Sequence, residues 1–122
     1  MLPRLSQFSA TQSLYLKFID TLKQQGFAGD LNPDYANRVV QATDNSLYQV
    51  LPQGVVYPKN LDDLVLIAKL SDQEAFHPVV LSPRGGGTGT NGQSLTDGLV
   101  VDISKHMNQV LEINADERWV RV

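Results

Sequence analysis

The sequence of 122 residues predicts an α+β fold, in which a helical lead-in precedes a small mixed β-sheet with a flanking helix. Apolar residues recur at helical spacing in two stretches, near the beginning of the chain and again after Asn60. Short apolar runs bounded by proline, glycine and other turn residues occupy much of the remainder. From residue 55 onward the order is strand, helix, strand and then further strands, which is typical of a sheet domain.

The helical lead-in is predicted to span residues 1–42. Its first helix runs from about residue 12 to residue 25, and Gly26 is well placed to end it. The apolar residues of this helix lie together at helical spacing and are expected to pack: Leu14, Tyr15, Phe18, Ile19 and Leu22. A second, short helix reaches to about Ala42, because Asn32-Pro33-Asp34 supplies a cap, a proline at the first helical position and an early acid.

The sheet domain is predicted to follow a turn at Thr43–Ser46, whose composition suits a hydrogen-bonded turn better than a metal site. Val55–Tyr57 is a short strand that Pro58 closes. Asn60 can cap the next helix, and the Asp62-Asp63 pair in its first turn suits the helix dipole better than a catalytic role. Its buried face is expected to consist of Leu61, Leu64, Val65, Ala68 and Leu70.

Four further strands are predicted in the second half of the chain. Val79–Leu81 reads as a buried strand, Leu99–Ile103 as another, and residues 110–114 and 118–122 as a β-hairpin around an Ala-Asp-Glu turn. Trp119 alternates with charged residues and is expected to bury its ring. The second hairpin strand stops with the chain, which leads us to expect a fragment of a longer protein.

Between two of these strands lies the most informative segment, Pro-Arg-Gly-Gly-Gly-Thr-Gly-Thr-Asn-Gly at residues 83–92. Six of the nine glycines in the sequence fall between Gly85 and Gly98. Glycine permits positive φ and close approach to the main chain, and a run of such residues can point successive amides at an anion, above all at phosphate oxygens. The pattern predicts a strand, an anion-binding glycine loop and a return strand.

Two known phosphate-binding motifs match the residue spacing of this segment, but each lacks a feature that its mechanism requires. Gly87, Gly89 and Gly92 satisfy G-x-G-x-x-G, but the gap before Leu99 is too short for the helix that a dinucleotide-binding fold requires. Residues 87–94 come near a P-loop, yet Gln93 stands where the phosphate lysine belongs. Hydrolysis of ATP or GTP is therefore not predicted.

The composition of the chain argues against several classes of partner and site. The net charge is −3, which argues against a nucleic-acid partner, and no apolar stretch approaches the roughly 20 residues that span a bilayer. No apolar signal core follows the first residues, so a cytoplasmic location is expected. The absence of cysteine removes disulfides and thiolate metal sites from this chain. Because His77 and His106 are expected at the surface, no catalytic residue and no metal ligand is predicted.

From Tyr48 to Val122 the chain resembles the amino-terminal half of the PCMH-type flavin domain of FAD-linked oxidases related to vanillyl-alcohol oxidase. The matching features follow in order: the strand ending in Pro58, the helix after it, the segment at 79–88, the strand to Asp102 and the terminal hairpin. The phrases Ala-Thr-Asp-Asn-Ser-Leu-Tyr-Gln and Arg-Gly-Gly-Gly-Thr-Gly-Thr-Asn-Gly-Gln are similar to the start of large bacterial D-2-hydroxyacid dehydrogenases, in particular the D-2-hydroxyglutarate type.

The resemblance implies that residues 43–122 are the first part of an FAD-binding domain and that its amides wrap the FAD pyrophosphate. The implied cofactor-binding residues are Pro83, Arg84, Gly85, Gly86, Gly87, Thr88, Gly89, Thr90, Asn91 and Gly92, with Pro58 bordering the cofactor. Arg84 suits a pyrophosphate or flavin contact and, equally, a local salt bridge or a cap of the loop. The resemblance also implies a 2-hydroxyacid substrate, and places an iron–sulphur cluster and the substrate pocket outside these residues.

Two alternatives stay open at this point. One is a non-catalytic phosphate- or nucleotide-binding module, or an assembly module that self-associates through exposed strand edges. The other is a flavin reductase of cell-wall precursor synthesis, which shares a glycine-rich cofactor loop.

Overall fold

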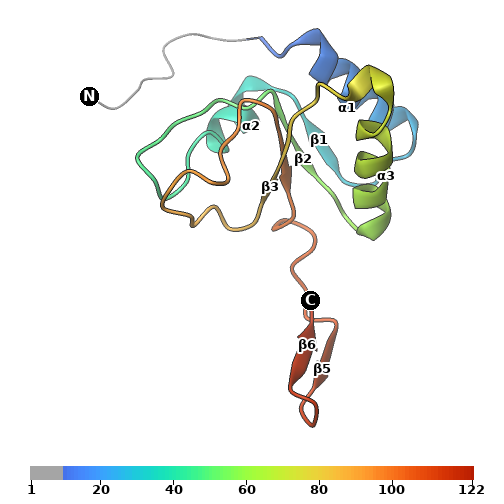
Figure 1. Ribbon diagram of the computed structural model, residues 1–122, viewed down its shortest axis with the longest axis vertical. Helices are drawn as coiled ribbons and strands as arrows, with labels where there is room; N and C mark the ends of the chain where they lie inside the picture. Colours follow the sequence, from blue (N-terminus) through green and yellow to red (C-terminus); the bar gives the residue numbers. More distant parts are fainter. Residues whose placement is uncertain (1–9) are drawn as a thin grey trace.

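The computed structural model describes residues 10–122, and Figure 1 shows a sheet domain with helices on both faces, from which a β-hairpin projects. The predicted α+β class is confirmed. The beginning of the predicted lead-in, residues 1–9, lies outside the described part of the chain. None of the helices within residues 10–122 has the length and apolar character needed to cross a membrane.

Four strands form the mixed sheet, in the order β1-β2-β4-β3. They are β1 (Asp30–Asn32), β2 (Gly54–Tyr57), β3 (Leu81–Arg84) and β4 (Leu99–Asp102). β1 is antiparallel to β2, whereas β2, β4 and β3 are parallel, with Val56 beside Val101 and Arg84 beside Asp102. All residues of β2 and β4 are buried, as expected for inner strands of a sheet that is covered on both faces.

Alternate residues of the inner strands define two cores. Val56, Leu99 and Val101 face α1 (Ser13–Gln24) and α3 (Leu61–Ser71), where Phe18 is fully buried. The Phe18 ring meets Phe76, in the short 3₁₀ helix Glu74–Phe76, edge-on at a centroid distance of 5.2 Å. The smaller cluster of Val55, Tyr57 and Val100 lies on the opposite face of the sheet, on the side of α2 (Tyr35–Val40).

The two predicted helices of the lead-in are present, but the cap of the second was predicted wrongly. α1 ends just before Gly26, whose φ of 87° is the left-handed turn expected there. Asp34, not Asn32, caps α2, because its carboxylate accepts a hydrogen bond from the Asn37 amide at 3.1 Å. Asn32 instead pairs with Val55 as the last residue of β1, a strand that the sequence did not predict.

The predicted cap of α3 is confirmed, since Asn60 Oδ1 accepts from the Asp63 amide at 3.0 Å. The predicted buried face is partly wrong: Leu70 is buried, but Leu61, Val65 and Ala68 are exposed. The buried residues are Asp63, Ile67 and Leu70. The helix has this phase because the Asp63 carboxylate turns inward, where it accepts from the amides of Ala28 and Lys59 at 2.8 Å each.

The third strand lies two residues later than predicted. β3 begins at Leu81, includes Pro83 and ends at Arg84, while Val80 is half exposed before it. Proline is tolerated here because β3 is an edge strand, so no neighbour needs its missing N–H. The β4 strand agrees with its prediction to within one residue.

The predicted terminal hairpin is confirmed as β5 (Glu112–Asn114) and β6 (Trp119–Arg121), which pair in antiparallel fashion. Figure 1 shows it extending away from the sheet domain. The prediction that Trp119 buries its ring is wrong, because its side chain is 36% exposed and its indole N–H donates to Glu117 at 2.7 Å. A two-stranded ribbon has no second layer within residues 10–122 that could cover the ring.

Candidate functional site

The three parallel strands end at one edge of the sheet, and the glycine loop begins there. Tyr57 ends β2, Asp102 ends β4 and Arg84 ends β3, with Arg84 directly beside Asp102 in the register. In open sheets with parallel strands, ligands bind outside the carboxyl ends of the strands. The position of the loop therefore matches the usual place of a cofactor site.

The loop crosses back over the sheet without a helix. β3 and β4 are parallel neighbours, so residues 85–98 must return to the opposite edge, where the Leu99 amide donates to the Val80 carbonyl at 2.8 Å. Within the described chain, no helix occurs between β3 and β4. This confirms that the letter pattern at Gly87–Gly92 is not a dinucleotide-binding helix start.

Six successive amides of the loop are unused by the protein. Within residues 10–122, none of the N–H groups from Gly85 to Thr90 donates a hydrogen bond to another group of the chain. The next amide, that of Asn91, donates to the Gln93 side chain at 3.0 Å. A Cβ placed on Gly85 would meet nothing within 4 Å, and one on Gly86 would meet only the Thr88 methyl at 3.6 Å. Free donors beside open space are what a diphosphate requires.

Arg84 does not point its charge into that open space. Its Nη2 donates to the Thr43 carbonyl at 2.8 Å, and its Nη1 lies 3.4 Å from Ser94 Oγ. The Ser94 hydroxyl in turn donates to the Asp44 carboxylate at 3.3 Å. The hydrogen-bonding Ser46 side chain is the main cause that lowers the pKa of Asp44 below its usual value, with smaller contributions from its amide, Ser94 and Arg84.

Two glycines of the loop have positive φ and lie against side chains. Gly87 has φ 64°, and a Cβ there would overlap the guanidinium of Arg84. Gly92 has φ 75°, and a Cβ there would come within 3.0 Å of the Tyr48 ring. Both positions therefore require glycine for the conformation and the packing of the loop itself.

The other predicted site residues differ in accessibility. Pro83, Thr88, Thr90 and Asn91 are exposed, whereas Gly89 lies half buried against the Gln93 side chain. Pro58 lies at the same sheet edge, but its side chain is fully buried. Sequence reasoning missed the contribution of the turn at residues 43–48, although its tightly spaced Asp44 and Ser46 were visible as a turn signal.

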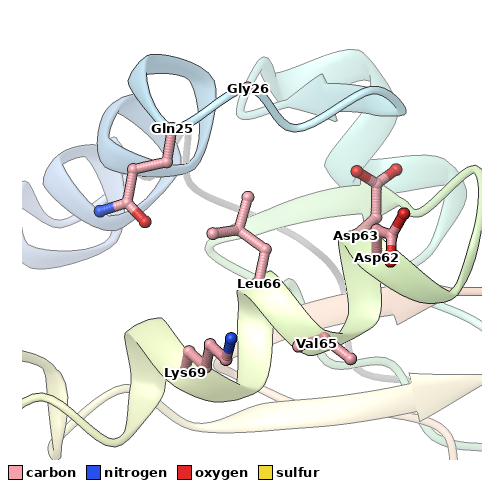
Figure 2. A pocket seen from close by; sticks show the side chains of 7 residues that line it. All are labelled: Gln25, Gly26, Asp62, Asp63, Val65, Leu66 and Lys69. Atoms are coloured by element: carbon pink, nitrogen blue, oxygen red, sulfur yellow. The ribbon is translucent and has the colours of Figure 1, made fainter.

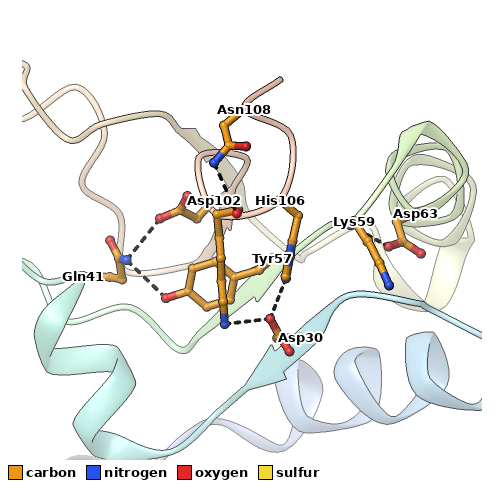
Figure 3. Close-up of polar contacts among 9 residues, drawn as sticks. Asp30, Gln41, Tyr57, Lys59, Asp63, Asp102, His106 and Asn108 are labelled. Carbon is orange, nitrogen blue, oxygen red and sulfur yellow. Dashed lines mark hydrogen bonds and ion pairs between the residues drawn. The ribbon is translucent and has the colours of Figure 1, made fainter. Parts of the chain in front are cut away.

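A second polar cluster occupies the same edge of the sheet and is shown in Figure 3. Asp102 accepts from the Ser104 amide at 2.8 Å and from Gln41 Nε2 at 3.1 Å, and Gln41 also donates to the Tyr57 hydroxyl at 3.2 Å. This buried carboxylate anchors the end of β4. Among the described residues, Gln41 Oε1 is buried without a partner.

Asp30 holds the turn after β4 against β1. Its carboxylate lies 2.8 Å from the Lys105 ammonium and 2.7 Å from His106 Nε2. The hydrogen bond from Lys105, followed by that from His106, lowers the pKa of Asp30, while the same contact raises the pKa of Lys105. His106 thus has a structural partner, and His77 is exposed beside the Asp72 carbonyl, so neither histidine faces the glycine loop.

A pocket of about 300 Å³ lies elsewhere, between the end of α1 and the outer side of α3. Figure 2 shows Gln25 and Gly26 on one side and Asp62, Leu66 and Lys69 on the other. Both oxygens of Asp63, which also lines it, already accept backbone amides. In residues 10–122 no cluster of histidine and acidic side chains could hold a metal ion. The glycine loop is thus the better candidate site.

Comparison with known proteins agrees with this choice. The sequence model of the FAD binding domain family matches residues 52–122, which include the whole loop. The D-2-hydroxyglutarate dehydrogenases of Pantoea ananatis and Escherichia coli are 52% and 51% identical over all 122 residues. The chain spans 12% of the length of these curated relatives. The glycolate oxidase subunit GlcD of Bacillus subtilis is 37% identical over 83 residues, which are 66% of this chain and 17% of that protein.

The fold also matches solved structures. An alkyldihydroxyacetonephosphate synthase superposes with a TM-score of 0.72 at 20% sequence identity, over 91% of this chain and 22% of that one. At this level of identity the match shows the fold alone.

Proposed function

The chain belongs to the FAD binding domain family, and on this premise we propose that residues 84–92 hold the pyrophosphate of FAD. The observation that carries the proposal is the row of six unused amides from Gly85 to Thr90 at the carboxyl edge of a parallel sheet. The exposed hydroxyls of Thr88 and Thr90 are further donors. Bound FAD accepts a hydride equivalent from a substrate, and the share of this chain is to hold its phosphates and so place the flavin.

Not every residue implied by the resemblance contributes in the same way. Pro83 and the residues from Gly85 to Asn91 offer main chain or exposed side chains to the cofactor. Gly92 serves the conformation of the loop, since it has positive φ and a Cβ at this position would press against the Tyr48 ring. Pro58 can border the site only through its main chain, because its ring is buried.

For the longer protein we propose oxidation of a D-2-hydroxyacid, with D-2-hydroxyglutarate as the first candidate, to the 2-oxoacid. Its support is the similarity of the whole chain to dehydrogenases named for that substrate. Residues 43–122 are then the first part of the FAD-binding domain, and residues 1–42 its lead-in. We place the catalytic groups in the remainder of that protein. Any iron–sulphur cluster also belongs there, because this chain contains no cysteine to bind it. The cytoplasmic location stays a prediction.

The isolated chain has a feature that favours self-association. The hairpin exposes apolar side chains on two strands, including Ile113 at 69% and its cross-strand partner Val120 at 53%. Exposed strand edges of this kind invite pairing with a second copy. We expect dimers or larger species of the 122-residue chain in analytical ultracentrifugation, and Ile113→Lys should shift them toward the monomer. An unaltered size distribution in that variant would exclude the hairpin as the contact.

The cofactor assignment is tested by calorimetric titration of FAD and ADP into the flavin-free protein. We expect both to bind, since they share the pyrophosphate. Gly86→Val should abolish binding of both, because its side chain would occupy the open space beside the free amides. Ala115→Val, which introduces the same side chain at the exposed hairpin turn, is the control. Normal FAD occupancy in Gly86→Val would refute the assignment.

Titration, flavin absorption and flavin reduction together distinguish the alternatives. A phosphate-binding module without flavin function would bind ADP or inorganic pyrophosphate, yet the full-length protein would carry no flavin absorption. A flavin reductase of cell-wall precursor synthesis would bind FAD but would not reduce it with a D-2-hydroxyacid. Reduction of the bound flavin by D-2-hydroxyglutarate supports the proposed dehydrogenase.

A further inference from the structure

Within the described chain, the first part of the glycine loop, residues 85–90, has no main-chain hydrogen bonds that could fix its conformation. Its amides from Gly85 to Thr90 make none within the described residues, and flexible glycine backbone loses much conformational freedom when it is ordered. A loop that presents free donors must therefore be held by contacts at its two ends. The structure places both of these contacts on one distant segment, the turn at Thr43–Ser46.

The first end of the loop is held through the Arg84 side chain. Its guanidinium donates to the Thr43 carbonyl at 2.8 Å, across 41 residues of sequence, and lies where a Cβ of Gly87 would be. The planar fork thus contacts the turn on one side and the loop backbone on the other. A guanidinium is suited to this because its several donors are fixed in one plane.

The second end of the loop is held through Ser94. Its hydroxyl donates to the Asp44 carboxylate at 3.3 Å and lies 3.4 Å from Arg84 Nη1. Asp44 is itself held in the turn by the Ser46 amide, which donates to its Oδ1 at 2.8 Å. Arg84, Ser94 and the Thr43-Asp44 pair therefore form one hydrogen-bonded clip that closes the loop at its base.

We propose that Arg84, Ser94 and Asp44 are positioning residues of the cofactor site: they clip both ends of the glycine loop to the turn at residues 43–46. The inference rests on the proposed function. The clip keeps the six amides in place before the cofactor arrives, so that less ordering is needed on binding. Arg84 acts through the loop backbone and not as a direct phosphate ligand.

The test uses the full-length protein freed of its flavin, with FAD and ADP titrated into each variant. Arg84→Met keeps the length of the side chain and removes every donor, and we expect it to weaken both ligands about 10- to 100-fold, the equivalent of one charge-assisted hydrogen bond. Ser94→Ala, which removes only a hydroxyl, should weaken both by a smaller factor. Arg121→Met on the exposed hairpin is the matched control and should bind normally.

Three readouts separate positioning from a direct charge–phosphate contact. The double variant Arg84→Met/Ser94→Ala should bind no more weakly than Arg84→Met alone, because the two residues belong to one clip. Arg84→Lys should fail to restore affinity, since one ammonium cannot replace the fork. The dependence of affinity on salt should be the same in Arg84→Met and the unaltered protein, because no phosphate charge is lost.

Restored affinity in Arg84→Lys together with a reduced salt dependence in Arg84→Met would overturn the inference in favour of a direct contact. Normal binding in both Arg84→Met and Ser94→Ala would overturn it without affecting the cofactor assignment. If the unaltered protein bound neither FAD nor ADP, the proposed function would fail and the clip would fail with it.

Discussion

Asp63 offers the sharpest test of how the fold around this site is held together. Asp63 is 3% exposed, and its carboxylate accepts from two amides at 2.8 Å each, that of Ala28 in the loop after α1 and that of Lys59 in the connection between β2 and α3. It thus ties three elements together at the start of α3. Its neighbour Asp62 is exposed in the same helical turn, so the pair differs in environment but not in chemistry.

Asp63→Ala removes both acceptors. A hydrogen bond to a charged group contributes about 1.5–3 kcal/mol, but Ala28 is exposed and its amide can turn to water, so we expect a loss of about 2–4 kcal/mol. Asp62→Ala removes only a favourable interaction with the helix dipole, at most about 1 kcal/mol. Urea unfolding gives both free energies, and hydrogen exchange should show faster exchange of the Ala28 and Lys59 amides only in Asp63→Ala. Equal destabilisation by the two variants would refute the reasoning.

Two further predictions concern the stability that the hydrophobic core and the Asp30 ion pair contribute. Phe18→Ala should destabilise the protein by about 3–5 kcal/mol, because the ring is fully buried against Phe76, whereas Leu16→Ala on the exposed face of the same helix should have little effect in urea unfolding. The pKa of Asp30 is lowered by Lys105, so the stability from this pair is present above the unfolded pKa of Asp30 and is lost as pH falls through the lower folded value. Asp30→Asn should remove this contribution to the pH dependence of the free energy of unfolding at acid pH. An unchanged pH dependence at acid pH would contradict the stabilising role of the Asp30–Lys105 pair.

The sequence predicts the elements of this fold better than their phase. Apolar residues at helical spacing located α1 and α3, and short continuous apolar runs located β2 and β4. The phase of α3 was missed because a carboxylate, that of Asp63, occupies the buried side of the helix, and one of the two amides it accepts from, that of Ala28, lies 35 residues away in the sequence. β1 was missed because Asp-Leu-Asn has no strand signature and is a strand only through pairing with β2.

In the candidate site, too, the sequence predicted the position of the loop but not the contacts that hold it. The cluster of glycines located the loop, because a backbone that needs positive φ or close approach of another molecule selects glycine at those positions. The contacts that hold the loop could not be read in advance, because the Arg84 partner is a carbonyl oxygen, and every residue has one. Trp119 is a case in which the pattern predicted the wrong environment. Alternation with charged residues is typical of a strand with one covered face, but the hairpin has no covering layer within the described residues.

Gly86 and Gly87 look equivalent in the sequence, yet the structure assigns them different physical roles. Gly87 has φ 64° and lies against the Arg84 guanidinium, so Gly87→Ala should cost about 1–2 kcal/mol of stability from the left-handed backbone alone and distort the loop as well. Gly86 has neither constraint, so Gly86→Val should leave the unfolding of the flavin-free protein nearly unchanged while FAD and ADP binding is lost. Thermal unfolding beside calorimetry separates the two effects. A Gly86→Val protein that unfolded as early as Gly87→Ala would show that the space beside Gly86 serves the fold, and loss of binding would then say nothing about where the phosphates lie.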